Sequence, residues 1–139
     1  MKTYLALSLA LVVLSLSSVG QVFATSPGFS LTSSCDEPYF CGTDTVTITS
    51  LNGFSGTVSL TTTVQKDNCS THCSLSASMT PNSVTITAGG TATSTLGFSG
   101  GSCGGGQLNC QFTITITGKS GSISNSTQVF ECLGTNCPI

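Results

Sequence analysis

The chain has few charged side chains, and it lacks arginine and tryptophan altogether. Its 139 residues include five acidic side chains and three lysines, and the formal net charge is −2. Proteins that bind nucleic acid or anionic membrane surfaces present clusters of basic residues, and the sequence has no such cluster. We therefore expect neither kind of partner.

Signatures of catalysis are equally scarce. The single histidine, His72, lies between Cys69 and Cys73, and neither a serine-hydrolase motif nor a credible pair of carboxylates accompanies it. General acid–base catalysis needs a base with a partner that orients it. We therefore predict that the protein is not an enzyme and that it needs no cofactor.

We expect neither a zinc site nor a calcium site. Zinc bound through His72 would need neighbouring thiolates that stay reduced. Calcium would need oxygen ligands in a suitable arrangement, and the acidic residues show no Asp-x-Asp spacing. Those acidic residues are Asp36, Glu37, Asp44 and Glu131.

Only the amino-terminal segment is strongly apolar. Residues 1–24 contain a lysine near the start, an apolar run over 4–16 and a small-residue boundary that ends at Ala24. This order is typical of a secretory signal peptide, and the run is shorter than the about 20 residues of a membrane-spanning helix. We predict cleavage after Ala24, a location outside the cell or on its surface, and one domain over 25–139. An uncleaved membrane anchor is the alternative.

The chain does contain eight cysteines, in four close pairs. They are Cys35 and Cys41, Cys69 and Cys73, Cys103 and Cys110, and Cys132 and Cys137. Disulfides persist in exported proteins, so we expect all eight cysteines to form disulfides. The favoured scheme joins the two members of each pair, because short spacings make their encounter easy. Bonds between pairs, such as Cys35 to Cys132, are the alternative.

Between the cysteines, polar and apolar residues alternate almost without a break, as in residues 45–49 and 112–117. A period of two is typical of strands with one buried face, and glycine-containing breaks at 52–56, 88–90 and 119–121 predict turns. We predict an all-β, seven-stranded antiparallel sandwich with Greek-key connections. The predicted strands span residues 28–34, 44–51, 56–64, 74–79 with a continuation at 84–87, 91–98, 111–118 and 122–132. The side chains predicted to face the core are Val46, Ile48, Val58, Leu60, Val64, Val84, Ile86, Ala92, Leu96, Phe98, Phe112, Ile114, Ile116 and Val129.

Alternating strand directions would bring all the cysteines to one end of this domain. The connections 35–43, 65–73 and 99–110 and the tail after residue 132 would lie there, with the glycine turns at the other end. Loops held by disulfides can present contact residues, although the aromatic rings at 39 and 40 could instead cover the end of the core. The candidate contact residues are Asp36, Glu37, Tyr39, Phe40 and His72. The glycine-rich stretch 100–106 is predicted to be a flexible loop and not a phosphate-binding loop.

Two sequons, beginning at Asn68 and Asn125, predict N-glycosylation. The first has a cysteine in its middle position, which makes it a poorer acceptor site. Asn125 has the same strand parity as Ile123 and Val129, so its side chain is expected to face inward. That orientation argues against its modification.

Three stretches share one pattern of consecutive strands: LNGFSGTVSL at 51–60, PNSVTITAGGTATSTL at 81–96 and TITITGKSGSISNST at 113–127. With this pattern, nearly all of 28–132 resembles the immunoglobulin-like modules of archaeal and bacterial secreted and cell-surface proteins. The resemblance implies the sandwich fold. It says little about function, since such modules serve as spacers, adhesive units and binding domains.

The chain departs from these modules in having one copy and eight cysteines, whereas they usually occur in tandem and lack cysteine. The inter-sheet cystine of antibody domains is also missing, and its strands carry Val46, Ile48, Ile114 and Ile116 instead. We predict a non-catalytic structural or adhesive module that presents disulfide-constrained loops. A soluble module that binds a glycan or small ligand at the same end is the alternative. A surface protein, a glycan or another copy of the chain are the expected partners.

Overall fold

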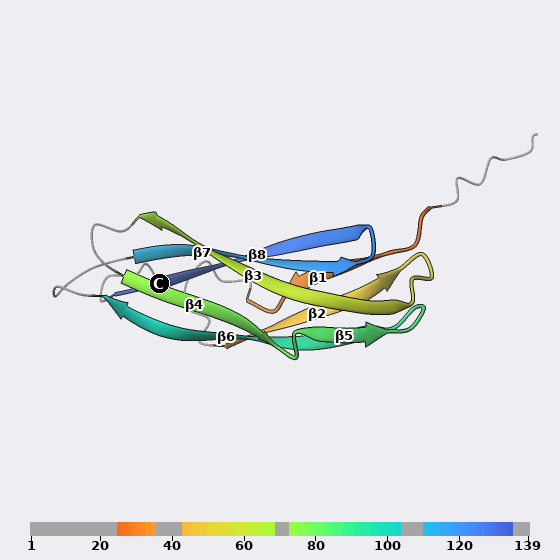
Figure 1. Ribbon diagram of the computed structural model, residues 1–139, viewed down its shortest axis with the longest axis horizontal. Coiled ribbons are helices and arrows are strands. Elements are labelled where there is room, and N and C mark those ends of the chain that lie inside the picture. The colour runs from red at the N-terminus through yellow and green to blue at the C-terminus, as the bar shows by residue number, and fades with distance from the viewer. Residues whose placement is uncertain (1–24, 36–42, 69–72, 104–109, 135–139) are drawn as a thin grey trace, which may run out of the picture.

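The computed structural model describes residues 25–35, 43–68, 73–103 and 110–134, and its regular elements are all β-strands (Figure 1). The strands are β1 (Gly28–Ser33), β2 (Thr43–Leu51), β3 (Gly56–Asn68), β4 (Cys73–Thr80), β5 (Ser83–Ile86), β6 (Thr91–Cys103), β7 (Cys110–Ser120) and β8 (Ile123–Leu133). The all-β class is therefore confirmed. Within these ranges no helix is long and apolar enough to cross a membrane. The predicted signal peptide, residues 1–24, lies outside the described residues.

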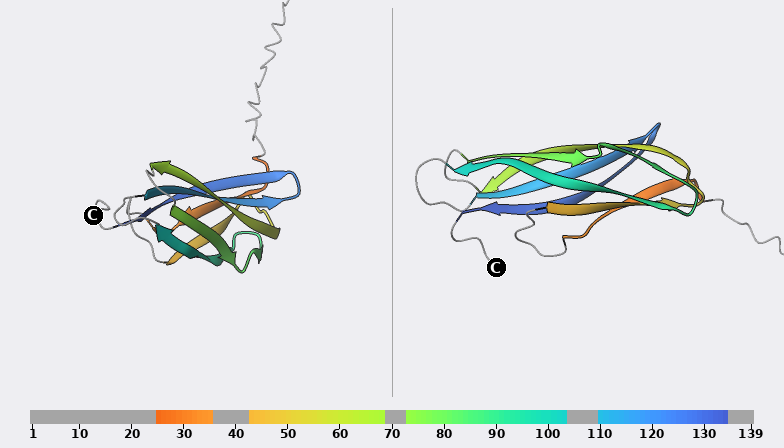
Figure 2. Two further views of the ribbon diagram at one scale, coloured as in Figure 1. Left: turned by 60° about the vertical axis from the view of Figure 1, so that its left-hand side comes forward. Right: turned by 90° about the horizontal axis from the view of Figure 1, so that it is seen from below.

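The strands form two antiparallel four-stranded sheets that lie in two layers (Figure 2). The first sheet has the order β1-β2-β6-β4, and the second has the order β5-β3-β7-β8. Their inward faces share one cluster of buried side chains. Because successive side chains of a strand point to opposite faces, the other side of each sheet is left for hydroxyl-bearing residues.

The described residues form eight strands, where the sequence predicted seven, because one predicted strand is two separate strands. Residues 74–79 and 84–87 were expected to form one interrupted strand, but β4 pairs with β6 in the first sheet and β5 pairs with β3 in the second. Pro81 follows a cis peptide bond and ends β4, because proline has no N–H group to donate to the ladder. The chain keeps its direction while it changes sheet (Figure 1).

The alternating pattern identified the core correctly. Of the predicted core residues, all are buried except Val64, Ala92 and Phe98, and these three are partly buried and pack against the same cluster. The pattern missed Phe29, Leu31, Phe54 and Met79, which are also buried. Phe29 and Phe54 contact each other with ring centroids 5.4 Å apart. Each of these missed residues lies near the end of a strand or in a turn, where the alternation is short.

Hydrogen bonds from side chains join the two sheets along both of their sides. On one side, Asn125 Nδ2 of β8 donates to the carbonyl oxygen of Phe29 in β1 at 2.8 Å. On the other side, Thr62 Oγ1 of β3 donates to the carbonyl oxygen of Ala77 in β4 at 2.7 Å. Polar groups at edge strands invite pairing with other chains when they are left open. These bonds attach the edge strands β1, β8 and β4 to the facing sheet of the same molecule.

The glycine turns lie together at the end of the molecule where β2, β5 and β7 finish, as predicted. Asn52 and Gly53 have φ angles of 52° and 76°, the left-handed conformation that an Asn-Gly turn requires. Ser50 joins this turn to the one at 87–90, because its hydroxyl donates to the carbonyl of Phe54 at 2.7 Å and accepts from the N–H of Gly89 at 3.1 Å. A buried hydroxyl therefore holds two connections together.

Gly118 allows β7 to approach the core closely, and this yields a first prediction. A Cβ atom at this position would lie 3.0 Å from Phe29 Cε2, 3.0 Å from Val58 Cγ1 and 3.2 Å from Leu31 Cδ1. We expect Gly118→Ala to lower the free energy of unfolding by about 1–3 kcal/mol through overpacking, as measured by urea denaturation. Gly97→Ala is the matched control, since a Cβ there has open space and should leave stability equal or slightly higher. Equal stability of the two variants would contradict the proposed packing.

Candidate functional site at the cysteine-rich end

Five strands end close together at the end of the molecule opposite to the glycine turns (Figure 1, left). We call this end the cysteine pole and define it by the terminal residues Asn68, Cys73, Cys103, Cys110 and Leu133. Cys73 lies opposite Cys103 in the register of β4 and β6, and Cys110 lies opposite Leu133 in that of β7 and β8. The sequence therefore placed these strand ends at one end of the domain correctly.

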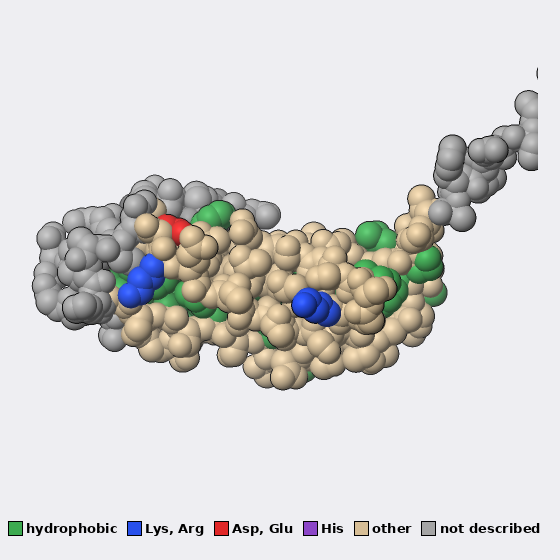
Figure 3. Space-filling model, turned by 45° about the horizontal axis from the view of Figure 1, so that its top comes forward, with side chains coloured by type: hydrophobic (Ala, Val, Ile, Leu, Met, Phe, Trp, Pro, Cys, Tyr) green, Lys and Arg blue, Asp and Glu red, His purple; other side chains and the backbone are tan. Residues whose placement is uncertain are grey.

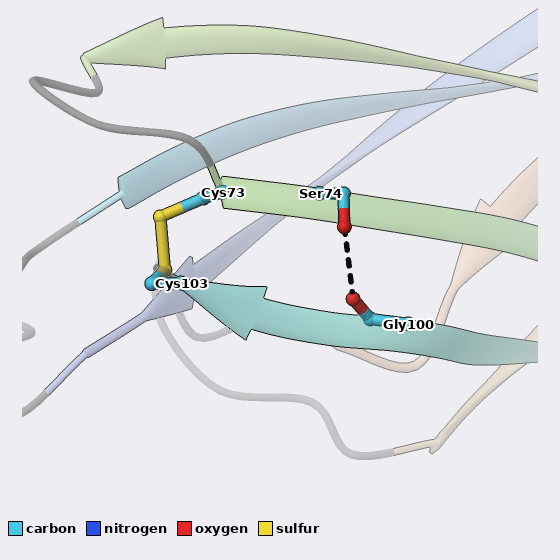
Figure 4. Close-up of a disulfide and its surroundings, with 4 residues drawn as sticks. All are labelled: Cys73, Ser74, Gly100 and Cys103. Atoms are coloured by element: carbon cyan, nitrogen blue, oxygen red, sulfur yellow. Dashed lines mark hydrogen bonds between the residues drawn. A yellow bond between two sulfur atoms is a disulfide. The ribbon is translucent and has the colours of Figure 1, made fainter. Parts of the chain in front are cut away.

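A disulfide joins Cys73 to Cys103 across two neighbouring strands (Figure 4). The two Cα atoms are 4.1 Å apart and the residues are 30 positions apart in the sequence. Pairing within Cys69–Cys73 and within Cys103–Cys110, which the sequence favoured, is therefore wrong. Register explains the difference: two cysteines directly opposite each other in an antiparallel pair already have the separation that a disulfide needs. Sequence spacing could not show this opposition.

The remaining cysteines of the described chain are also oxidised. Cys35, Cys110 and Cys132 are disulfide-bonded, and their partners lie outside the described residues. Cys110 and Cys132 are fully buried. The two strands of the β7–β8 hairpin are thus each anchored by a disulfide at the cysteine pole.

The glycine-rich stretch after Phe98 begins as strand and not as a flexible loop, which corrects the prediction for residues 100–103. β6 continues to Cys103, and the register shifts between Ser74 and Ser76 of β4. Gly100 has a φ of 74°, and its carbonyl oxygen accepts a hydrogen bond from Ser74 Oγ at 3.3 Å (Figure 4). A glycine in this conformation is typical of a bulge, so β6 absorbs an extra residue and still brings Cys103 opposite Cys73.

The connection between β1 and β2 lies well short of the cysteine pole. Thr43, the first residue of β2, pairs with Gly97, whereas β6 continues for six more residues to Cys103. At about 3.3 Å a residue, the strand ends differ in level by about 20 Å. Of the described cysteines, Cys73, Cys103, Cys110 and Cys132 lie at the predicted pole, but Cys35 lies short of it, along the side of the molecule.

Asp44 anchors this lower connection. Its carboxylate is buried, with 2% of its surface exposed, and it accepts hydrogen bonds from Ser33 Oγ, from Ser34 Oγ at 2.6 Å and from the Ser34 N–H at 3.0 Å. Ser33 Oγ in turn accepts a bond from the N–H of Cys35 at 3.1 Å. A buried carboxylate needs such donors to offset its lost hydration. Asp44 therefore holds the chain in place on both sides of the segment 36–42.

Several predicted site residues cannot be placed. The candidate contact residues Asp36, Glu37, Tyr39, Phe40 and His72 lie outside the described residues, as do Cys41, Cys69 and Cys137. Of the four acidic residues that could have formed a calcium site, Asp44 accepts hydrogen bonds from the hydroxyls of Ser33 and Ser34. Glu131 is buried and lies opposite Phe112. In the part of the chain that the structure describes, no three histidine, cysteine or acidic residues form a group that could hold a metal ion.

The two sequons have different surroundings. Asn68 is the last residue of β3 and pairs with Gln111. Asn125 directs its amide toward the first sheet, where Nδ2 donates to Phe29, while its Oδ1 accepts from the N–H of Ser126 at 3.1 Å. Glycosylation would attach a sugar to the same Nδ2 atom and would disturb the bond between the sheets. Asn125 is nevertheless exposed, which corrects the expectation that it faces inward, so only its bond to Phe29 opposes modification.

Two kinds of functional residue were missed from the sequence, although parity could have revealed both. Asp44 has the parity of the buried Val46, and Glu131 has that of Val129, so both carboxylates had to point inward. Phe130 has the opposite parity and is 49% exposed. The buried carboxylates act as anchors, and the exposed ring is available for contact.

Comparisons with known proteins give no relative from which a role can be transferred. No family model matches the chain, and no match is found among curated proteins.

The cross-strand disulfide gives a second prediction. Non-reducing peptide mapping should recover the peptide that contains Cys73 linked to the one that contains Cys103. Replacing both residues with alanine should lower the free energy of unfolding by about 3–4 kcal/mol, the value that the chain-entropy model assigns to a loop of this length. Recovery of Cys69–Cys73 and Cys103–Cys110 peptides from the native protein would show that the pairing is different.

A third prediction concerns Asp44. Asp44→Ala removes the acceptor for Ser33 and Ser34 and should lower the free energy of unfolding by about 2–3 kcal/mol, since hydrogen bonds to a charged group are the stronger ones. Asp67→Ala is the control, because Asp67 is exposed and its loss should change stability by at most about 0.5 kcal/mol. Chemical denaturation of both variants would measure the difference, and similar values would rule out the anchoring role.

Proposed function

We propose that the chain is a secreted, non-catalytic module of the cell surface with a structural or adhesive role. In this proposal residues 1–24 are a cleaved signal peptide, and residues 25–139 form an immunoglobulin-like sandwich with Greek-key connections. The cysteine pole and the β1–β2 connection present loops to a surface protein or a glycan. The module works by contact, with neither a cofactor nor turnover.

The strand orders support the immunoglobulin-like part of the proposal. Such domains have strands A, B, E and D in one sheet and C, F and G in the other. If β6 takes the place of E and β4 that of D, the order β1-β2-β6-β4 reads A-B-E-D, and β3-β7-β8 reads C-F-G. β5 lies beside C, where variable-type domains have an extra strand, but here it follows the strand assigned to D, whereas in those domains the extra strand precedes D. The support from strand order is therefore limited to β1-β2-β6-β4 and β3-β7-β8.

The observation that carries the adhesive role is the Cys73–Cys103 bond between two strand ends at the cysteine pole. Loops that leave strands joined in this way have fewer conformations, and less entropy is lost when they bind. Cys110 and Cys132 add two further anchors at the same pole. Cys73, Cys110 and Cys132 are buried, so the disulfides stabilise the fold as well, but their concentration at one end favours a role in presentation in addition to folding.

Among the expected partners, another copy of the chain is the weakest. Edge-to-edge assembly needs unoccupied strand edges, and the bonds of Asn125 and Thr62 attach three of the four edge strands, β1, β4 and β8, to the facing sheet, while the remaining edge strand, β5, has only four residues. A partner of a different kind, bound at a loop or at an outer face, suits the molecule better. Static light scattering of the purified protein would test this choice.

The contact loop provides the fourth prediction. Replacing Tyr39 and Phe40 with alanine should leave the melting temperature unchanged and abolish retention of the protein on the envelope of its native host. Leu51→Ala is a matched control, because it removes an exposed hydrophobic side chain at the opposite end. Retention that is unchanged in the double variant would overturn the adhesive role of this loop.

A further inference from the structure

The outer face of the second sheet contains one aromatic side chain among hydroxyl and amide groups. Among the described residues, only Leu51 and Phe130 are large hydrophobic side chains with substantial exposure, at 42% and 49%. Leu51 lies beside a turn, but Phe130 lies within β8, two residues before the buried Cys132. Figure 3 shows that uncharged polar side chains and backbone cover most of the surface seen in that view. Phe130 therefore departs from the pattern of its own face.

Polar groups in fixed positions lie near Phe130 on the same face of the sheet. Thr113 lies directly opposite Phe130, and its Oγ1 donates to Asp67 Oδ2 at 2.5 Å. Thr115 lies opposite Gln128 on the next row of the same face and accepts a bond from Gln128 Nε2 at 3.3 Å. These bonds hold a carboxylate, two hydroxyls and an amide beside the ring, and each group keeps further hydrogen-bonding capacity.

The first sheet offers no comparable arrangement. Thr47 of β2 and Thr93 of β6 lie opposite each other on its outer face, and so do Thr45 and Thr95. None of these four hydroxyls makes a hydrogen bond with the described part of the chain. Among the described residues, no exposed aromatic ring accompanies them there. In this part of the chain, the second sheet alone combines an apolar platform with polar groups in fixed positions.

We propose that Phe130, together with Asp67, Thr113 and Gln128, binds a neutral glycan chain. A pyranose ring has an apolar face of C–H groups that can stack on an aromatic ring, and its hydroxyls can bond to the surrounding carboxylate and amide. The carboxylate of Asp67 is the one charge of this set, and it would repel an acidic group placed against it, although the exposed Lys66 beside it in the sequence reduces this repulsion. This inference rests on the proposed adhesive function and names the class of its ligand.

The disulfides favour binding at this position. Phe130 precedes the disulfide-bonded Cys132, and Thr113 follows the disulfide-bonded Cys110. Both strands of the platform are thus held near their ends at the cysteine pole, so less entropy is lost on binding. A glycan on this face would lie next to the loops that the pole presents.

Affinity electrophoresis in native gels tests the inference. The probes are three soluble neutral polysaccharides, namely hydroxyethylcellulose, a galactomannan and a β-1,3-glucan, with alginate as an acidic comparison. We expect at least one neutral probe to retard the native protein and alginate not to do so. Phe130→Ala should raise the apparent dissociation constant roughly tenfold, whereas Phe130→Trp should preserve binding and so report on the stacking surface. Leu51→Ala, the matched exposed hydrophobe, should behave as the native chain does.

The possible failures can be told apart. The inference is overturned if no neutral probe retards the native protein, if alginate alone does, or if a Phe130→Ala protein with an unchanged melting temperature binds normally. Should Phe130→Ala fold poorly, Gln128→Ala on the exposed surface is the second variant, and its binding must weaken. Retention on the envelope that depends on Tyr39 and Phe40 but not on Phe130 would leave the proposed function intact and remove only the glycan site.

Discussion

The core has one layer of side chains from each sheet, and this thin two-sided packing is the constraint on which the rest of the molecule depends. Phe29 and Ile48 of the first sheet share the core with Val58 and Ile114 of the second. Because alternate residues face opposite sides of a strand, a register shift of one residue would expose the entire buried set. Alternation is therefore kept through the middle of the strands, with register shifts confined to the ends of β3 and β6 near the cysteine pole, and at Gly118 even one extra carbon atom has no room.

The same constraint determines where function can reside. The inward faces are fully used by packing, and hydrogen bonds between the sheets occupy parts of the edges. What is left for partners are the outer faces and the strand ends. The cysteine pole uses the strand ends, since five strands extend past the β1–β2 connection and the Cys73–Cys103 bond holds two of them together. Phe130 lies on the outer face next to this pole.

The few charges serve structure as much as contact. Asp44 and Glu131 are buried, and Asp44 organises the hydroxyls of Ser33 and Ser34 where the chain leaves β1. Every buried polar side-chain atom of the described chain has a hydrogen-bond partner. Because the chain has few charged side chains, serine and threonine hydroxyls make most of the side-chain hydrogen bonds. Interactions of this kind depend on short-range geometry and change little with salt.

The sequence by itself determined the all-β class, most of the inward-facing residues and the direction of every strand, because the period of two and the glycine turns are local properties of the chain. Only the tertiary structure decided which cysteines meet, that β4 and β5 belong to different sheets, and that Cys35 lies below the pole. These features follow from the register between strands distant in sequence. Cys73 meets Cys103 because β4 and β6 pair in that register. The spacing of residues along one strand does not show which strand will lie beside it or in which register.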